Sequence, residues 1–90
     1  MKRFQRGDRV RIVRIDRTED DRAVIAAQKT MSGRTGTVQR VLMRDISAWV
    51  RMDDALPAGL ATFPDADPRS RDLLLWPNEC EPEQAPLPSE

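Results

Sequence analysis

The fold is decided by the stretch Gly33-Arg34-Thr35-Gly36-Thr37-Val38-Gln39-Arg40-Val41, which is similar in pattern to Gly7-Asp8-Arg9-Val10-Arg11-Ile12. Each stretch places glycine or aspartate at a turn and then alternates apolar residues with polar or basic ones. This arrangement is typical of a tight turn that leads into a half-buried β-strand. Two such units in the first half of the chain predict a small, strongly bent β-barrel.

The rest of the chain completes a mainly β architecture. Alternation of apolar and polar residues places Val10 and Ile12 toward the core, with Arg9 and Arg11 toward solvent. The repeat slips at residues 12–13, which indicates a bulge or strong coiling. On a later strand Ala48, Val50 and Met52 share one face, and Trp49 and Arg51 share the other. We expect five strands, over residues 8–15, 37–43, 47–53, 72–76 and about 81–82, a turn over 44–45, and one 3₁₀ turn over 77–80.

Two long connections, residues 16–35 and 54–71, separate these strands. The first fits a short helix capped by Thr18, with acidic residues in its first turn and residues 23–27 continuing it. It also fits an additional strand, because Val24 and Ile25 are β-branched. The conformation of this segment is left open. We expect one domain over residues 1–82 and a disordered, Pro-rich acidic tail over 83–90.

Five short strands, two long loops and a 3₁₀ turn before the last strand describe an SH3-like barrel. The two glycine-led stretches resemble the KOW motif of ribosomal and transcription-elongation proteins. The chain also looks like the SH3-like barrel of the nitrile hydratase β subunit and of small photosynthetic accessory subunits, and residues 50–53 and 73–82 are similar to the closing strands of these barrels. Connection 16–35 is longer than a KOW loop, and the His-Arg segment of the nitrile hydratase subunit is missing. The resemblance therefore implies the fold more directly than it implies RNA binding, and it does not imply nitrile hydratase activity.

Composition describes a small domain with an economical core. The chain has 90 residues, of which 39% are hydrophobic, and its mean hydropathy is −0.62. Its net charge is zero, whereas disordered chains usually combine low hydropathy with high net charge. Residues 1–51 contain 13 Lys and Arg against 6 Asp and Glu (+7), and residues 52–90 contain 2 against 9 (−7). Either a basic face lies opposite an acidic one, or the two halves interleave and their charges mix.

The sequence predicts no enzyme, cofactor or metal site. It has no histidine, which excludes Ser-His and Cys-His nucleophiles. Its one cysteine, Cys80, stands between glutamates that raise a thiol pKa, so we expect it to be buried and structural. Asp53-Asp54 and Asp65-x-Asp67 lack EF-hand spacing and are expected to be solvated. Without a signal peptide or membrane-spanning run, we expect a cytoplasmic protein that contacts no membrane and has no small-molecule substrate.

The arginines are the candidate binding residues. Neighbouring antiparallel strands bring several of them within reach of one phosphate backbone, and Trp49 offers a ring that stacks on a base or on a partner's side chain. With few aromatic residues, the chain can hardly build the aromatic-lined groove of conventional SH3 domains. The candidate binding residues are Arg9, Arg11, Arg34, Arg40, Trp49 and Arg51.

Two functions from different classes compete. The first is a non-enzymatic adaptor or accessory subunit that docks onto a larger protein assembly; a phage or plasmid protein that decorates a larger machine is a version of it. The alternative is a KOW-like module that contacts RNA or DNA backbone through the arginine face. A contiguous basic face favours nucleic acid. Ion-paired arginines, with Leu56, Leu60 and Phe63 exposed, favour a protein partner.

Overall fold

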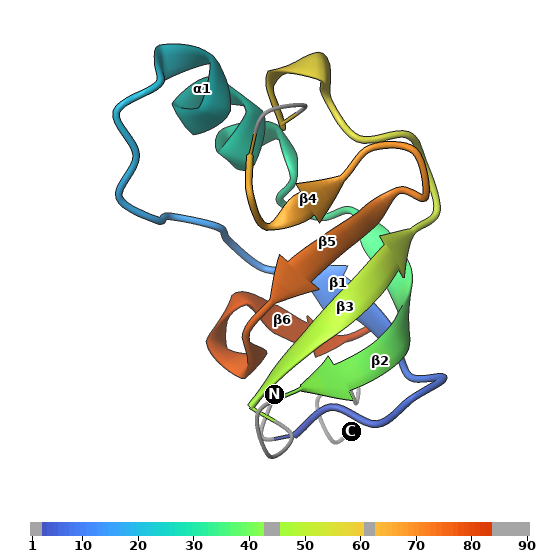
Figure 1. Cartoon of the computed structure of the whole chain (residues 1–90). Coiled ribbons are helices and arrows are strands. Elements are labelled where there is room, and N and C mark those ends of the chain that lie inside the picture. The colour runs from blue at the N-terminus through green and yellow to red at the C-terminus, as the bar shows by residue number, and fades with distance from the viewer. Residues whose placement is uncertain (1–2, 43–45, 61–62, 84–90) are drawn as a thin grey trace.

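The protein is mainly β, with one open sheet of six antiparallel strands in the order β4-β5-β3-β2-β1-β6 (Figure 1). This computed structural model describes residues 3–42, 46–60 and 63–83. Helix α1 and the 3₁₀ turn η1 lie together at one end of the sheet. In chain order the elements are β1 (Arg9–Ile12), α1 (Arg22–Thr30), β2 (Thr35–Leu42), β3 (Ser47–Met52), η1 (Ala58–Leu60), β4 (Ala66–Asp67), β5 (Asp72–Leu75), η2 (Pro77–Glu79) and β6 (Cys80–Pro82).

The predicted five-stranded barrel needs correction in two respects. All five expected strands are present, but a sixth strand, β4, forms within the predicted 54–71 loop and pairs with β5. A strand of two residues is too short to show an alternation of apolar and polar residues, so it could not be predicted from the sequence. The sheet also stays open, because among the described residues β4 and β6 are its two edges and do not pair with each other.

The first strand is shorter than the alternation predicts. It ends at Ile12, where the chain leaves the sheet, and the Val13 backbone N–H donates to the Glu79 carbonyl instead of continuing a ladder. The predicted 3₁₀ turn is confirmed as η2. The turn expected at 44–45 lies outside the described residues. Of the expected tail, the structure describes Glu83 alone, whose N–H donates to the Arg9 carbonyl.

Connection 16–35 contains a helix and not an additional strand. Helix α1 is capped by Asp21 and not by Thr18: the Asp21 carboxylate accepts from the Ala23 N–H at 2.8 Å. The acidic residues therefore precede the helix, and Glu19 accepts from the backbone of Asp20 and Asp21. An N-cap residue is expected just before the apolar residues that repeat with the helical period, and Asp21 is closer to them than Thr18. That period of buried residues is Val24, Ala27, Gln28 and Met31.

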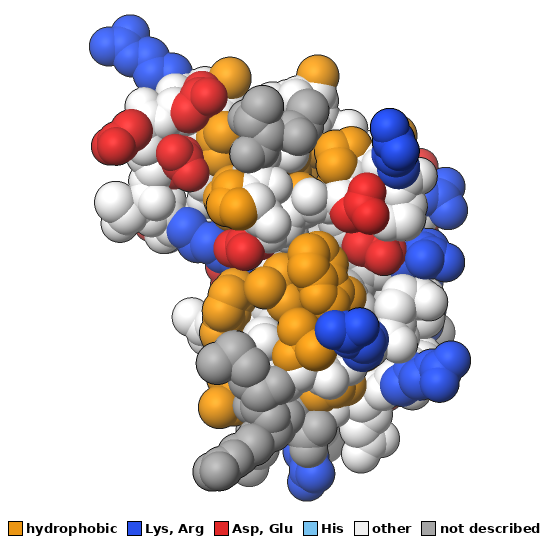
Figure 2. Space-filling model, in the orientation of Figure 1, with side chains coloured by type: hydrophobic (Ala, Val, Ile, Leu, Met, Phe, Trp, Pro, Cys, Tyr) orange, Lys and Arg blue, Asp and Glu red, His pale blue; other side chains and the backbone are white. Residues whose placement is uncertain are grey.

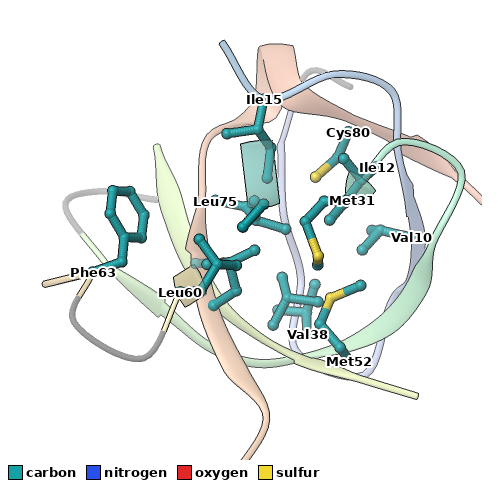
Figure 3. Packing of buried hydrophobic residues seen from close by; sticks show 14 of the residues in the cluster. Val10, Ile12, Ile15, Met31, Val38, Met52, Leu60, Phe63, Leu75 and Cys80 are labelled. Atoms are coloured by element: carbon teal, nitrogen blue, oxygen red, sulfur yellow. The ribbon is translucent and has the colours of Figure 1, made fainter. Parts of the chain in front are cut away.

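The core lies between the inner face of the sheet, α1 and the loop residues Leu56, Leu60 and Phe63. The predicted inward residues of β1, β2 and β3 are buried, and Arg9, Arg11, Trp49 and Arg51 lie on the opposite face, as expected. Gly59 allows α1 to approach η1 closely, because a Cβ there would lie 2.5 Å from the Ala23 carbonyl oxygen. Figure 3 shows the strand, helix and loop side chains meeting in one cluster. Its members include Phe4, Val10, Ile12, Met31, Val38, Val50, Met52, Leu60, Leu73, Leu75 and Cys80.

Arg17 fastens connection 16–35 to the sheet. Its guanidinium donates to both carboxylate oxygens of Glu79, at 2.6 and 2.9 Å, and to Asp65 at 3.1 Å. It also donates to the Leu74 carbonyl at 2.6 Å, at the end of β5 that β4 does not cover. Only 19% of the Arg17 side chain and 9% of the Glu79 side chain are exposed. The pair is thus largely desolvated, where loss of one partner is costly.

Aromatic rings and an amide complete the surroundings of Arg17. The guanidinium carbon lies 4.7 Å from the centroid of the Trp76 ring and 5.6 Å from that of Phe63. The Arg17 backbone N–H donates to the side-chain oxygen of Gln28 on α1. One residue therefore connects the loop to the helix, to β5 and to η2.

Replacing Arg17 by Met should lower the free energy of unfolding by about 3 kcal/mol, because it leaves the Glu79 carboxylate buried without its cation. Urea unfolding followed by tryptophan fluorescence measures this loss. Arg14→Met is the matched control: Arg14 pairs with Asp16, but the two side chains are 76% and 72% exposed, so its effect should stay within about 0.5 kcal/mol. Equal losses in the two variants would show that Arg17 does not anchor the loop.

Candidate functional site: the outer face of the sheet

Four of the predicted binding arginines, Arg9, Arg11, Arg40 and Arg51, lie on strands of the sheet, and three of these form ion pairs with carboxylates. Arg9 donates to both oxygens of Asp53 at 2.6 Å, to Glu83 at 2.5 Å and to the Thr37 hydroxyl at 2.9 Å. Hydrogen bonds, first from Arg9 and then from Thr35, hold the pKa of Asp53 well below its ordinary value. The same contacts, led by the one to Asp53, raise the pKa of Arg9. This cation is not available as a bare phosphate-binding group.

Arg11 and Arg51 are also paired with acidic residues on neighbouring strands. Arg11 donates to Glu81 on β6 at 3.0 Å, and Arg51 donates to Asp72 on β5 at 3.1 Å. These residues face each other directly in the strand register. Arg34 serves a structural purpose at the entrance to β2, where it donates to the carbonyls of Thr30 and Ala55. A contiguous, unpaired basic face is therefore absent from the described part of the sheet.

Two of the predicted binding residues, Arg40 and Trp49, are neighbours on a different part of this face. Arg40 on β2 lies directly opposite Trp49 on β3, and Trp49 lies directly opposite Leu74 on β5. A bulge between residues 38 and 40 resets the register of β2 and brings about this alignment. Within the described residues, the Arg40 side chain has no ion pair or hydrogen bond.

A shallow hollow of about 240 Å³ lies over this row, with Trp49 in its lining. Figure 2 shows hydrophobic side chains gathered over β3 and β5, with acidic side chains toward the β4–β5 turn and basic ones toward β2. Trp49 and Leu74 are both half-buried, so part of each apolar surface stays in water. We call this surface the Trp49 face; its residues are Gln39, Arg40, Trp49, Asp67, Asp72 and Leu74.

Sequence reasoning missed several residues that matter here. Asp53 and Asp65, expected as solvated loop carboxylates, form ion pairs with Arg9 and Arg17, although their side chains remain partly exposed. The loop residues whose exposure would have favoured a protein partner are not exposed: Leu60 and Phe63 belong to the core, and Leu56 packs against it. Leu74 gave no signal, and Asp67 was expected only as a solvated carboxylate, because the places of both on this face depend on which strands become neighbours.

A second, larger cleft of about 580 Å³ lies where connection 16–35 meets η2. Its charged groups are already paired within the protein, Arg17 with Glu79 and Arg14 with Asp16. A cleft with satisfied charges offers little to attract a charged ligand. Its lining consists of Arg14, Asp16, Arg17, Trp76, Asn78 and Glu79.

Cys80 is buried, as expected. Burial, followed by the neighbouring Glu79 carboxylate, raises the pKa of the Cys80 thiol to about 12, so the thiol stays protonated near neutral pH and is a poor nucleophile.

Among residues 3–42, 46–60 and 63–83 no three His, Cys, Asp or Glu side chains gather as metal ligands. In the same part of the chain, no helix has the length and apolar character needed to cross a membrane.

No protein-family model, curated protein or solved structure significantly matches this chain.

The Arg9–Asp53 pair makes stability depend on pH. The pKa of Asp53 is lower in the folded chain than the value of about 4 in the unfolded chain. Its stabilising effect is therefore complete above pH 4 and is lost as the pH falls toward the folded value. Asp53→Asn should lower the free energy of unfolding by at most about 1 kcal/mol at pH 7, because the Arg9 and Asp53 side chains are both 41% exposed.

This difference between the parent and Asp53→Asn should shrink between about pH 4 and pH 2, as urea unfolding at each pH measures. The adjacent Asp54→Asn is the control, since Asp54 is exposed and has no ion pair among the described residues. A difference that is the same at pH 7 and pH 2 would show that the pair does not stabilise the fold.

Proposed function

We propose that this protein is a non-enzymatic binding module that docks onto a larger protein assembly through the Trp49 face, as an adaptor or accessory subunit. The observation that carries the proposal is the row Arg40–Trp49–Leu74, where apolar surface lies beside a cation that has no ion pair within the described residues, at the hollow lined by Arg40 and Trp49. Tryptophan and arginine are the residues most enriched among those that dominate protein–protein binding energy. Neighbouring arginines are neutralised within the chain, so the apolar row stands out from a balanced surface.

The resemblance to SH3-like barrels belongs to this proposal. Strands β1, β2, β3, β5 and β6 follow the predicted order, with η2 before the last strand, and β4 is an addition at one edge. Small bent sheets of this kind present a rigid outer face, on which a tryptophan loses little conformational entropy when it binds. That rigidity supports docking through strands in preference to loops.

Nucleic-acid binding is the alternative function. The ion pairs of the strand arginines argue against it. Affinity for a phosphate backbone comes from cations that release counterions when they bind. Arg9, Arg11 and Arg51 would first have to give up carboxylate partners at 2.5–3.1 Å. Of the candidate binding arginines on the described strands, Arg40 alone keeps no carboxylate partner, and one cation is few for a sequence-independent phosphate interface.

A photo-crosslinking experiment in the host cells tests the docking proposal. A benzophenone amino acid replaces Gln39, at the rim of the hollow, or Val13, which is 46% exposed elsewhere on the surface. Position 39 should yield a discrete adduct with another protein, identified by mass spectrometry, and position 13 should not. Adding Trp49→Ala should reduce the adduct at least tenfold, as loss of a hot-spot tryptophan predicts. An adduct insensitive to Trp49→Ala, or equal yields from both positions, would contradict the proposal.

Fluorescence anisotropy with labelled single-stranded RNA and duplex DNA, at about 50 and 200 mM salt, tests the alternative. We expect no binding at micromolar protein. The informative variants are Arg40→Glu and its control Arg22→Glu, which reverses an exposed arginine at the start of α1 with the same change in net charge. Binding that falls steeply with salt and is lost in Arg40→Glu, but kept in Arg22→Glu, would replace docking with nucleic-acid recognition.

A further inference from the structure

We infer that in the free protein the Trp49 face pairs with the Trp49 face of a second copy of this chain, in a weak two-fold dimer. The reason is the order of charges across the sheet. Acidic Asp67 stands on edge strand β4, apolar Leu74 and Trp49 follow on β5 and β3, and basic Arg40 stands on β2. The face is acidic at one end, apolar in the middle and basic at the other end.

The register places these side chains on one side of the sheet. Residues directly opposite each other on neighbouring strands point to the same face, and so do residues two apart on one strand. Asp67 lies opposite Asp72, which is two residues from Leu74, and Leu74 lies opposite Trp49. Trp49 in turn lies opposite Arg40. Asp67, Trp49 and Arg40 also line the same hollow, which confirms that they share a surface.

Such an order is self-complementary under a two-fold axis. An isologous interface brings the same patch of both subunits together, so each contact occurs twice. An axis that lies in the interface, parallel to the strands and above the outer face between β3 and β5, turns the second copy over onto the first and exchanges the ends of the row. It sets Arg40 of each copy against Asp67 of the other, and Trp49 against Leu74 of the second copy.

Both charged groups are open to such a contact. Neither Arg40 nor Asp67 belongs to an ion pair within the described residues, and the carboxylate of Asp67 accepts only from the backbone of Arg69 there. Their arginine and aspartate neighbours, by contrast, are paired within the chain, as Arg51 is with Asp72. A foreign partner would need matching charges at both ends, whereas a second copy supplies them by symmetry.

The dimer has a consequence for docking, and this part of the inference rests on the proposed function. Two half-buried apolar side chains offer far less than the roughly 1,200 Å² of total surface that stable interfaces bury. We therefore expect a dissociation constant of tens to hundreds of micromolar. Such a dimer covers the apolar row while no partner is bound, and a partner has to displace the second copy before it docks.

Charge-reversal complementation tests the dimer. Sedimentation velocity of the full chain, from about 10 μM to 1 mM in about 50 mM salt, should show concentration-dependent dimerisation. Arg40→Asp alone and Asp67→Arg alone should each raise the dissociation constant at least tenfold, because like charges then face each other across the axis. An equimolar mixture of the two variants should associate as a heterodimer, and the variant carrying both substitutions should recover the parent value within about threefold.

Arg22→Asp is the control, because it changes net charge equally but lies on α1, and it should leave the dissociation constant within twofold of the parent. Circular dichroism checks the fold of each variant. The equimolar mixture is a second check, because a misfolded variant would not form a heterodimer with the other one. A chain that stays monomeric at 1 mM, or a dimer unaffected by the two reversals, would overturn the inference.

Failure of the dimer is distinguishable from failure of docking. A monomeric chain whose Gln39 crosslink still captures another protein would leave the proposed function standing. A charge-dependent dimer in a chain whose crosslinks contain only a second copy would overturn docking and keep the dimer.

Discussion

The contact between Arg17 and Glu79 is the interaction on which the rest of the structure depends. Connection 16–35 leaves β1 with few apolar residues before α1, so packing alone gives it little to hold. The bidentate pair, stacked on Trp76, ties it to η2, and the further bond to the Leu74 carbonyl satisfies backbone at an open stretch of β5. Helix α1 can then cover the core at the end of a sheet that does not close.

Pairing between the two halves of the chain explains why the described part of the sheet has no contiguous, unpaired basic face. The basic first half and the acidic second half interleave in the sheet. This is the second of the two arrangements that the sequence allowed, in which the charges mix. Arg9, Arg11 and Arg51 meet carboxylates that follow them by 21 to 74 positions in sequence. On the Trp49 face, within the described residues, an apolar row remains beside Arg40 and Asp67, which form no ion pair, and both proposals concern this surface.

Part of the outer face of the sheet was predictable from the sequence. Alternation on single strands correctly directed Arg9, Arg11, Trp49 and Arg51 outward, because a strand's side chains point to opposite faces in turn. The partners of these residues were not predictable, since a salt bridge depends on which strand becomes the neighbour and in what register. Leu74 and Asp67 entered the site only when β5 came to lie beside β3 and β4.

The sequence by itself determined the elements whose signals are local. It determined the mainly β class, the inward and outward faces of β1 to β3, the η2 turn at Pro77 and the burial of Cys80. Tertiary structure decided the sixth strand, the open sheet, the burial of Leu60 and Phe63, and the anchoring by Arg17. The division has one physical reason: periodicity and turn chemistry act over a few residues, whereas β pairing and desolvated ion pairs join residues distant in sequence.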